Sequence, residues 1–156
     1  MLKNAKLIDD FVSTNEESGL LYWIGQQPWD CSLKRRVQHY GYKYDYKAKT
    51  VKADDYLGEL PPKLIQIAVR LSRFEFEEIP NQIIVNEYIP GQGIAPHIDC
   101  VPCFGPAVAS ITLGGGVEMQ FSDPSDEQAK EAIYLRPRSL LVLTADARFR
   151  WKHGIP

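Results

Sequence analysis

The stretch Gly93-Ile-Ala-Pro-His-Ile-Asp-Cys100 contains a histidine and an aspartate two residues apart, His97 and Asp99. On a β-strand such residues point to the same face, so the pair can offer an imidazole nitrogen and a carboxylate oxygen to one metal ion. A third ligand has to come from elsewhere, and His153 ends the segment 148–153, in which aromatic and basic residues alternate. This alternation predicts that His153 faces inward. Two histidines and one carboxylate form the facial triad of non-heme Fe(II) oxygenases, which leaves three coordination positions open.

The His-x-Asp spacing is weak by itself, because it occurs in many unrelated proteins and a lone histidine is commonly a hydrogen-bonded structural residue. Structural zinc, the competing metal, normally has a closed shell of four protein ligands. Cys100 and Cys103 follow directly as a C-x-x-C, but a zinc knuckle would want a second close pair, and the third cysteine is the distant Cys31. We therefore expect two loop thiols, a packed Cys31 and no disulfide framework.

The part of the chain from Gln82 onward is typical of short strands separated by turns. The expected strands are 82–88, 107–113, 117–121, 132–135, 139–144 and 148–153. Turn signals such as Pro90-Gly91, Gly114-Gly-Gly116 and Asp123-Pro124 separate them. Many short strands without intervening helices predict a sandwich or jelly roll, a fold that can seat a ligand between its sheets.

Two helices are predicted before these strands. Thr14-Asn-Glu-Glu17 has the pattern of a capping box ahead of an apolar run that Pro28 ends. Pro61-Pro62 precedes the second helix. Its apolar residues are spaced as one buried stripe: Leu64, Ile67, Ala68 and Leu71. The expected fold class is therefore α+β and mainly β, with N-terminal helices that support the sheets.

The segment between the two helices carries tyrosine at every second position. The four residues are Tyr40, Tyr42, Tyr44 and Tyr46. In an extended chain they share one face, and beside Arg35 and Arg36 such a row can stack a nucleobase and hold phosphates. A tyrosine stripe is also typical of a sheet face packed under a helix, because tyrosine favours strands. The sequence leaves both interpretations open, and His39, within this segment, is not expected to be a metal ligand.

Length and composition are those of one globular domain. The chain has 156 residues, 44% of them hydrophobic, and a net charge of −2. Its apolar runs are of strand length and its N-terminus has no signal-peptide pattern, so we expect an intracellular protein, cytoplasmic or nuclear, that is neither secreted nor membrane-spanning. The 3 cysteines agree with a reducing compartment. The charge does not indicate a polyanion-binding protein, although a small basic patch suffices for an enzyme that grips few phosphates.

An ordered set of motifs runs from Arg35 to the C-terminus. It comprises Arg35-Arg-Val-Gln-His-Tyr-Gly-Tyr42, Asn86-Glu-Tyr88-Ile-Pro-Gly-Gln-Gly-Ile-Ala-Pro-His97-Ile-Asp99, Ser110-Ile-Thr-Leu-Gly114, Arg138-Ser-Leu-Leu-Val-Leu143 and Arg148-Phe-Arg-Trp-Lys-His153-Gly-Ile155. Together these motifs closely resemble the AlkB family of Fe(II)- and 2-oxoglutarate-dependent dioxygenases. The resemblance implies a double-stranded β-helix (jelly roll) and a single AlkB-like dioxygenase domain over residues 1–156.

The resemblance also implies a site. His97, Asp99 and His153 would bind the iron, and Asn86 and Tyr88 would contact the cosubstrate 2-oxoglutarate. In such enzymes 2-oxoglutarate takes two of the open metal positions and O2 takes the last; 2-oxoglutarate becomes succinate while a substrate C–H bond is hydroxylated. A methyl group on a base nitrogen is then lost as formaldehyde.

The implied partner is a nucleic acid, DNA or RNA, with a modified base. The segment Arg35–Tyr42 resembles the part of the family that leads into its nucleotide-recognition lid. This resemblance favours the functional interpretation of the basic and tyrosine residues. The candidate substrate contacts are Arg35, Arg36, Tyr40, Tyr42 and Tyr44.

The sequence departs from the family at its C-terminal end. Relatives carry two arginines after the second histidine that pair with 2-oxoglutarate and the metal end of the site. Here the sequence stops at Pro156, and Arg148 and Arg150 come too early to substitute. We therefore expect a C-terminally truncated chain that lacks the last strands of the fold.

Several functions stay open. The first is a dioxygenase that demethylates or hydroxylates a modified nucleic-acid base. The second is a tRNA wobble-uridine side-chain hydroxylase, the branch that Gln92–Asp99 resembles most, and a protein methyl group is a further possible substrate. The third is a catalytically inert, truncated binding module. A zinc hydrolase or isomerase of the same fold would ignore 2-oxoglutarate.

Overall fold

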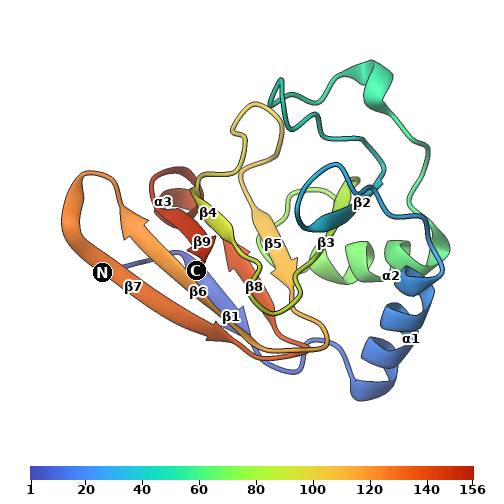
Figure 1. Cartoon of the computed structure of the whole chain (residues 1–156), viewed down its shortest axis with the longest axis horizontal. Helices are drawn as coiled ribbons and strands as arrows, with labels where there is room; N and C mark the ends of the chain where they lie inside the picture. The colour runs from blue at the N-terminus through green and yellow to red at the C-terminus, as the bar shows by residue number, and fades with distance from the viewer. The chain divides into compact units, whose positions relative to one another are not determined.

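The computed structural model describes the whole chain, Met1–Pro156, and most of its regular structure is strand (Figure 1). The elements follow in the order β1 (Ala5–Ile8), α1 (Thr14–Gly25), β2 (Arg36–Tyr40), a short 3-10 helix (Ala53–Asp55), α2 (Pro62–Leu71), β3 (Ile83–Glu87), β4 (Ile94–His97), β5 (Val108–Ile111), β6 (Val117–Asp123), β7 (Asp126–Leu135), β8 (Leu140–Leu143), α3 (Ala145–Phe149) and β9 (Lys152–Ile155). They form two compact units. The sandwich unit consists of Met1–Ile24 and Gly93–Pro156, and the insert unit is Gly25–Gln92.

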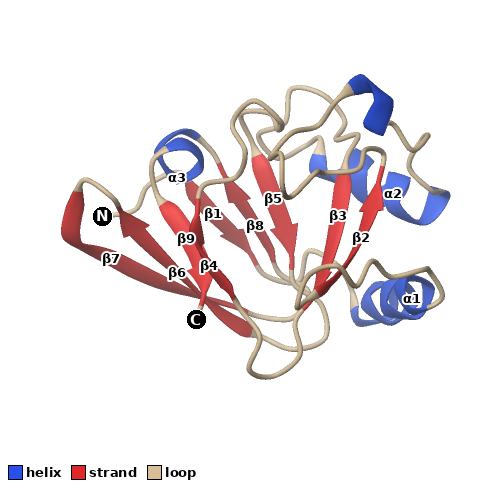
Figure 2. Ribbon diagram, turned by 45° about the horizontal axis from the view of Figure 1, so that its top comes forward, coloured by secondary structure: helices blue, strands red, loops and turns tan.

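The sandwich unit is built from two antiparallel sheets (Figure 2). One sheet has the strand order β1-β8-β5 and the other β4-β9-β6-β7. The central strand β8 is buried along its whole length, as its unbroken apolar sequence requires. Side chains of both sheets and of the segment through α3 form one core: Phe121, Leu135, Leu141, Leu143, Ala147 and Trp151. Since burying one large apolar side chain contributes about 1.5–3 kcal/mol, this core holds the two sheets together.

The first helix, α1, is capped one residue earlier than the sequence predicted. The Ser13 hydroxyl accepts a hydrogen bond from the Glu16 amide at 3.1 Å, and the Glu16 carboxylate accepts one from the Ser13 amide at 3.0 Å. The capping box is therefore Ser13 with Glu16, and the predicted box that began at Thr14 is wrong by one position. This register leaves Glu17 to turn inward, where it is buried and accepts a hydrogen bond from the Arg138 guanidinium at 3.2 Å.

The insert unit contains the antiparallel pair β2–β3 and the helix α2. The predicted apolar stripe of α2 is confirmed, because the residues that it buries are Leu64, Ile67, Ala68 and Leu71. β2 ends at Tyr40 because Gly41 follows with a φ of +82°, and any side chain there would run into the backbone carbonyl of Asn81. The tyrosine segment is therefore a strand only as far as Tyr40.

Strand prediction from sequence succeeded in the middle of the chain and failed elsewhere. The predicted strand 148–153 is instead the end of α3 followed by β9, which starts only at Lys152. The N-terminal strand β1 and the strand β4, which ends at His97, had no clear sequence signal. No helix in the chain combines the length and the hydropathy needed to cross a bilayer.

Candidate metal centre

The pairing of β4 with β9 brings two histidines together. His97 lies directly opposite His153 in the register, and their ring centroids are 4.6 Å apart. His153 is 9% exposed, so the predicted inward orientation is confirmed. Asp99 lies two residues beyond the end of β4, in the loop that follows, so the prediction that His97 and Asp99 share one strand is wrong.

The Asp99 carboxylate lies between the two imidazoles. Its Oδ1 is 3.3 Å from Nε2 of His97, and its Oδ2 is 3.5 Å from Nε2 of His153. One ligand atom from each of the three residues lies within 4.8 Å of the other two. The side chains of His97 and Asp99 therefore point to one place, as expected, but Asp99 does so from the loop after β4 and not from a continuous strand.

Hydrogen bonding fixes the orientation of the first imidazole. Nδ1 of His97 is 2.8 Å from the backbone carbonyl of Ala95. A carbonyl oxygen can only accept, so Nδ1 donates this bond, and Nε2 is the nitrogen that faces Asp99 and the interior of the site. A second nitrogen held in this way is the usual arrangement of a metal-binding histidine.

The electrostatics of the site keep its ligands in the form that binds a cation. Burial raises the pKa of Asp99, but the hydrogen bond with His97 and the charges of His153 and Arg148 outweigh burial and lower it below the ordinary 3.8. Burial lowers the pKa of His153 below the ordinary 6.5, although the Asp99 charge opposes this. At neutral pH the site therefore presents an ionised carboxylate and a neutral His153.

These residues fit an iron ion of the facial-triad type. Donor atoms about 2.1 Å from a metal and at right angles lie about 3 Å from one another, close to the 3.3 and 3.5 Å separations found here. Two imidazoles and one carboxylate are the donor set of non-heme Fe(II) sites. The buried Nδ1 of His153 has no hydrogen-bond partner, so the polar contact of this ring in the site is the one that its Nε2 makes with Asp99.

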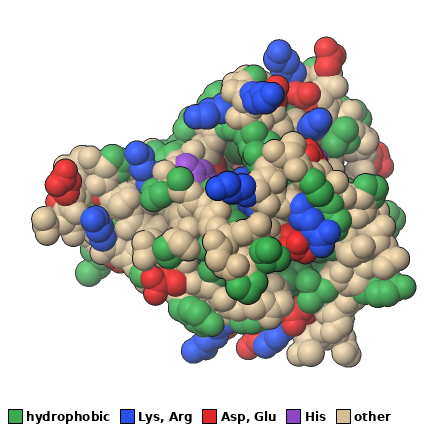
Figure 3. Space-filling view, in the orientation of Figure 1, with side chains coloured by type: hydrophobic (Ala, Val, Ile, Leu, Met, Phe, Trp, Pro, Cys, Tyr) green, Lys and Arg blue, Asp and Glu red, His purple; other side chains and the backbone are tan.

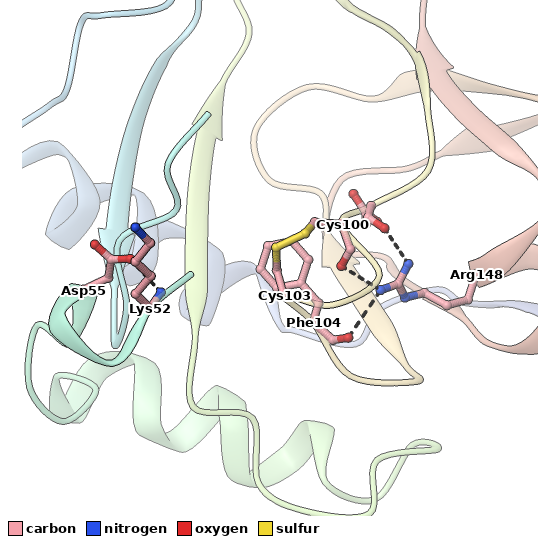
Figure 4. Close-up of a disulfide and its surroundings, with 7 residues drawn as sticks. Lys52, Asp55, Cys100, Cys103, Phe104 and Arg148 are labelled. Atoms are coloured by element: carbon pink, nitrogen blue, oxygen red, sulfur yellow. Dashed lines mark hydrogen bonds between the residues drawn. A yellow bond between two sulfur atoms is a disulfide. The ribbon is translucent and has the colours of Figure 1, made fainter. Parts of the chain in front are cut away.

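The loop that carries Asp99 is organised around Arg148 (Figure 4). This guanidinium donates to the backbone carbonyls of Asp99 at 2.8 Å, Cys100 at 3.2 Å, Phe104 at 3.4 Å and Gly105 at 3.2 Å. Arg148 is only 2% exposed, whereas the sequence pattern placed it on an outward, polar face. Sequence reasoning missed this residue because its partners lie more than 40 positions away.

The cysteines also differ from expectation. Cys100 and Cys103 are joined by a disulfide, so the prediction of two loop thiols is wrong (Figure 4). The bridge closes the start of the loop, where the Phe104 amide also donates to the Cys100 carbonyl at 3.2 Å. Cys31 is exposed rather than packed.

The predicted cosubstrate contacts lie in the insert unit. Asn86 is on β3 and exposed, and Tyr88 follows the end of this strand. The Asn86 side-chain oxygen accepts a hydrogen bond from Nε of Arg35 at 3.0 Å. The guanidinium of Arg35 also lies over the ring of Tyr46, 5.7 Å from its centroid. Arg35 and Asn86, predicted separately for substrate and cosubstrate, thus belong to one polar cluster.

Arg36 is engaged within the insert unit. Its guanidinium forms a two-pronged pair with the Glu87 carboxylate, at 2.6 and 2.9 Å, and lies 4.3 Å over the ring of Trp29. This hydrogen bond raises the pKa of Arg36 and lowers that of Glu87. A phosphate would have to displace Glu87 from a fork-like pair, so Arg36 is a less available anion contact than its sequence position indicated.

The tyrosines form ring contacts instead of a regular row. Tyr42 packs against Tyr56 with centroids 5.2 Å apart, and Tyr44 meets Tyr46 edge to face at 4.8 Å. The Tyr40 hydroxyl donates to the Gln38 side chain at 2.6 Å. All four tyrosines of the row are half-buried, whereas Lys43 and Asp45 between them are exposed, so the alternation of exposure persists without a strand.

The remaining arginine near the site is also paired. Arg150 lies 3.3 Å from Asp123 and 3.4 Å from Asp146. Both Arg148 and Arg150 are thus engaged by groups of the chain itself. On the face drawn in Figure 3, histidine atoms reach the surface and acidic and basic side chains are interspersed.

Comparison with known proteins agrees with this site. Residues 19–156 match the model of the 2OG-Fe(II) oxygenase superfamily. The Arabidopsis thaliana alkylated DNA repair protein ALKBH8 homolog is 36% identical over 96% of this chain and 50% of its own length. The mouse tRNA (carboxymethyluridine(34)-5-O)-methyltransferase ALKBH8 is also 36% identical, over 96% of this chain but only 24% of its own length. The chain thus spans half or less of these two relatives.

A solved structure gives the fold. That of OsALKBH1 superposes with a TM-score of 0.74 over 99% of this chain and 85% of the other, at 14% sequence identity. This similarity confirms the predicted jelly roll with supporting helices. With a superfamily match over most of the chain and AlkB relatives along nearly all of it, this chain belongs to the AlkB family of Fe(II)- and 2-oxoglutarate-dependent oxygenases.

Proposed function

We propose that this chain is a dioxygenase that oxidises a modified base in DNA or RNA, with His97, Asp99 and His153 as its iron ligands. The observation that carries the proposal is the convergence of three donor atoms within 4.8 Å across the β4–β9 pair. Names of the relatives support a nucleic-acid substrate, because they refer to DNA repair and to tRNA uridine.

The protein residues have defined roles in this proposal. His97 is held by Ala95 in the tautomer that binds metal through Nε2, and Asp99 supplies the negative charge. Asn86 and Tyr88 offer polar groups to 2-oxoglutarate, and Arg35, hydrogen-bonded to Asn86, orients this amide. Bound Fe(II), 2-oxoglutarate and O2 supply the oxidising chemistry, in which 2-oxoglutarate is decarboxylated to succinate and one oxygen atom enters a substrate C–H bond.

The substrate contacts belong to the insert unit. Tyr40, Tyr42 and Tyr44 are half-buried and aromatic, and a base stacked on such a ring gains about 1–3 kcal/mol. A methyl group on a base nitrogen, once hydroxylated, leaves as formaldehyde. The second candidate substrate is a tRNA wobble uridine, whose hydroxylated side chain is retained. It is favoured by the 36% identity with the mouse protein named for that nucleoside.

Metal binding is the first test. Titration of the chain with Mn(II), followed by electron paramagnetic resonance, should give one site per chain. His97→Ala should weaken binding at least about 100-fold, because a lost ligand costs more than a lost ligand support. The matched control is His39→Ala, which removes a histidine outside the set and should leave the affinity unchanged. Equal affinities in the two variants would contradict the assignment.

Turnover is the second test. With Fe(II), 2-oxoglutarate and O2, the chain should release succinate, faster with its substrate than without. An oligonucleotide with an N-methylated base should also release formaldehyde, whereas tRNA with a modified wobble uridine should gain one oxygen atom and release none. A chain that binds metal but forms no succinate with either would be the non-catalytic binding module instead.

A further inference from the structure

A buried arginine in the sandwich unit is not accounted for by the proposed chemistry. Arg148 is 2% exposed, and its guanidinium donates to four backbone carbonyls within the segment 99–105. Figure 4 shows this guanidinium facing Cys100 and Phe104. Nε, Nη1 and Nη2 all take part. The charged group therefore lies inside a ring of carbonyl oxygens that belong to one loop.

Burying a charge is costly unless its hydrogen bonds are satisfied. Arg150, two residues further on, is half-exposed and paired with carboxylates. The hydrogen-bond partners of Arg148 are neutral carbonyls, and burial lowers its pKa although the Asp99 charge opposes this. An aliphatic side chain would fill the same core position without this cost, so the guanidinium is needed for the loop that it holds.

This loop contains a proposed metal ligand. Asp99 lies beyond β4, so no strand ladder holds its backbone. The shortest hydrogen bond of Arg148, at 2.8 Å, goes to the carbonyl of Asp99 itself. The bonds to Phe104 and Gly105 tie the far end of the loop to the same planar group. A guanidinium is rigid and presents its donors in a fixed fork, so it fixes both ends of the loop relative to each other.

We propose that Arg148 is a positioning residue of the metal centre. By fixing the backbone of Asp99–Gly105, it holds the Asp99 carboxylate between the imidazoles of His97 and His153 before a metal binds. This inference rests on the proposed ligand set. It adds a residue that does not touch the metal but sets how well the three ligands are arranged for it.

The experiment compares Arg148→Met and Arg148→Lys with the unmodified chain. Mn(II) affinity should fall about 10- to 100-fold in Arg148→Met, the usual effect of removing a ligand support. Co(II) bound in its place should show an altered visible spectrum, because the carboxylate is no longer held in one geometry. The Mn(II) affinity of Arg148→Lys should lie between those of Arg148→Met and the unmodified chain, because an ammonium group keeps the charge but cannot span both ends of the loop.

Two controls separate positioning from general stability. Leu141→Ala opens a cavity in the core, so it destabilises the fold without touching the loop. Arg150→Met removes a neighbouring charge that binds carboxylates. Both should keep Mn(II) affinity within about twofold and an unchanged Co(II) spectrum. Amide hydrogen exchange of residues 99–105 in the metal-free protein should rise in Arg148→Met and not in the controls.

The possible failures are distinguishable. If the unmodified chain binds no metal, the proposed function fails first and this inference fails with it. If the unmodified chain binds metal and Arg148→Met binds it equally well, the ligand set stands and only the positioning role is overturned. The positioning role is likewise overturned if Leu141→Ala weakens binding as much as Arg148→Met does. Should Arg148→Met not fold, Arg148→Lys carries the comparison by itself.

Discussion

At the scale of single residues, His39, the histidine outside the metal set, is harder to protonate in the folded protein than a solvated histidine. His39 in the insert unit accepts a hydrogen bond from the Tyr44 amide at Nδ1, at 3.4 Å, and its Nε2 is buried without a partner. Burial lowers the pKa of His39 below the ordinary 6.5, with Asp30 opposing and Lys43 assisting. A proton at Nδ1 would break the bond from Tyr44, so the folded protein favours the neutral ring.

This difference predicts a pH dependence of stability. The unfolded chain takes up a proton near pH 6.5, before the folded chain does, so the free energy of unfolding should fall as the pH drops from about 7.5 to 5.5. His39→Gln, which cannot titrate, should show a smaller fall. The measurement is urea denaturation at both pH values. The pKa of His153 is also lowered by burial, so His153 should account for part of the loss of stability that remains in His39→Gln. If His39→Gln lost as much unfolding free energy between pH 7.5 and 5.5 as the unmodified chain, His39 would not be the source of the pH dependence.

At the scale of elements, the β4–β9 pair sets the geometry of the site. A side chain at Gly154 would place its Cβ 2.7 Å from the Ile94 carbonyl oxygen and 2.9 Å from the Pro96 nitrogen. Both obstacles are backbone atoms, so the strands themselves would have to separate. The absence of a side chain at Gly154 therefore allows His97 to lie opposite His153.

Gly154→Ala should accordingly weaken both the fold and the site. We expect a loss of about 1–3 kcal/mol in the free energy of unfolding, the usual cost of overpacking. Mn(II) affinity should fall at least about tenfold, because the two imidazoles move apart. Gly115→Ala is the matched control, since its Cβ would meet nothing within 4 Å. Calorimetry and Mn(II) titration measure the two effects, and retained affinity in a destabilised Gly154→Ala would show that the register is not what orders the ligands.

These elements show how far the sequence could predict the site. His97 and His153 were identifiable because the chain has only 3 histidines. His97 belongs to the His-x-Asp pair, and His153 ends a segment in which aromatic and basic residues alternate. Asp99 was identified by spacing, but its place in a loop was not, since nothing local shows where β4 ends. Arg148 was assigned to an outward face by its alternation with aromatic residues. The true reason for its burial is a set of carbonyls more than 40 residues away.

At the scale of the whole molecule, the mainly β class and most strands could be predicted, whereas long-range partners could not. β1 pairs with β8, so that Ala5 lies opposite Leu143. A strand of four residues with a partner so distant carries little signal of its own. The tyrosine segment stops being a strand for a related reason: Gly41 has a φ of +82°, which the alternating pattern does not reveal. Local periodicity predicts elements, but their ends depend on contacts elsewhere.

The single domain predicted from length can be tested through the metal. All three candidate ligands lie in the sandwich unit, so a bound ion stabilises that unit directly. At a free Mn(II) concentration 100 times the dissociation constant, the gain is about 2.7 kcal/mol, which corresponds to roughly 5–10 °C in melting temperature for a chain of this size. If the chain unfolds as one cooperative domain, calorimetry should show one transition that moves upward as a whole. His97→Ala should abolish the shift. Two transitions, of which only one responds to Mn(II), would mean that the sandwich and insert units unfold separately and that the prediction of a single domain is wrong.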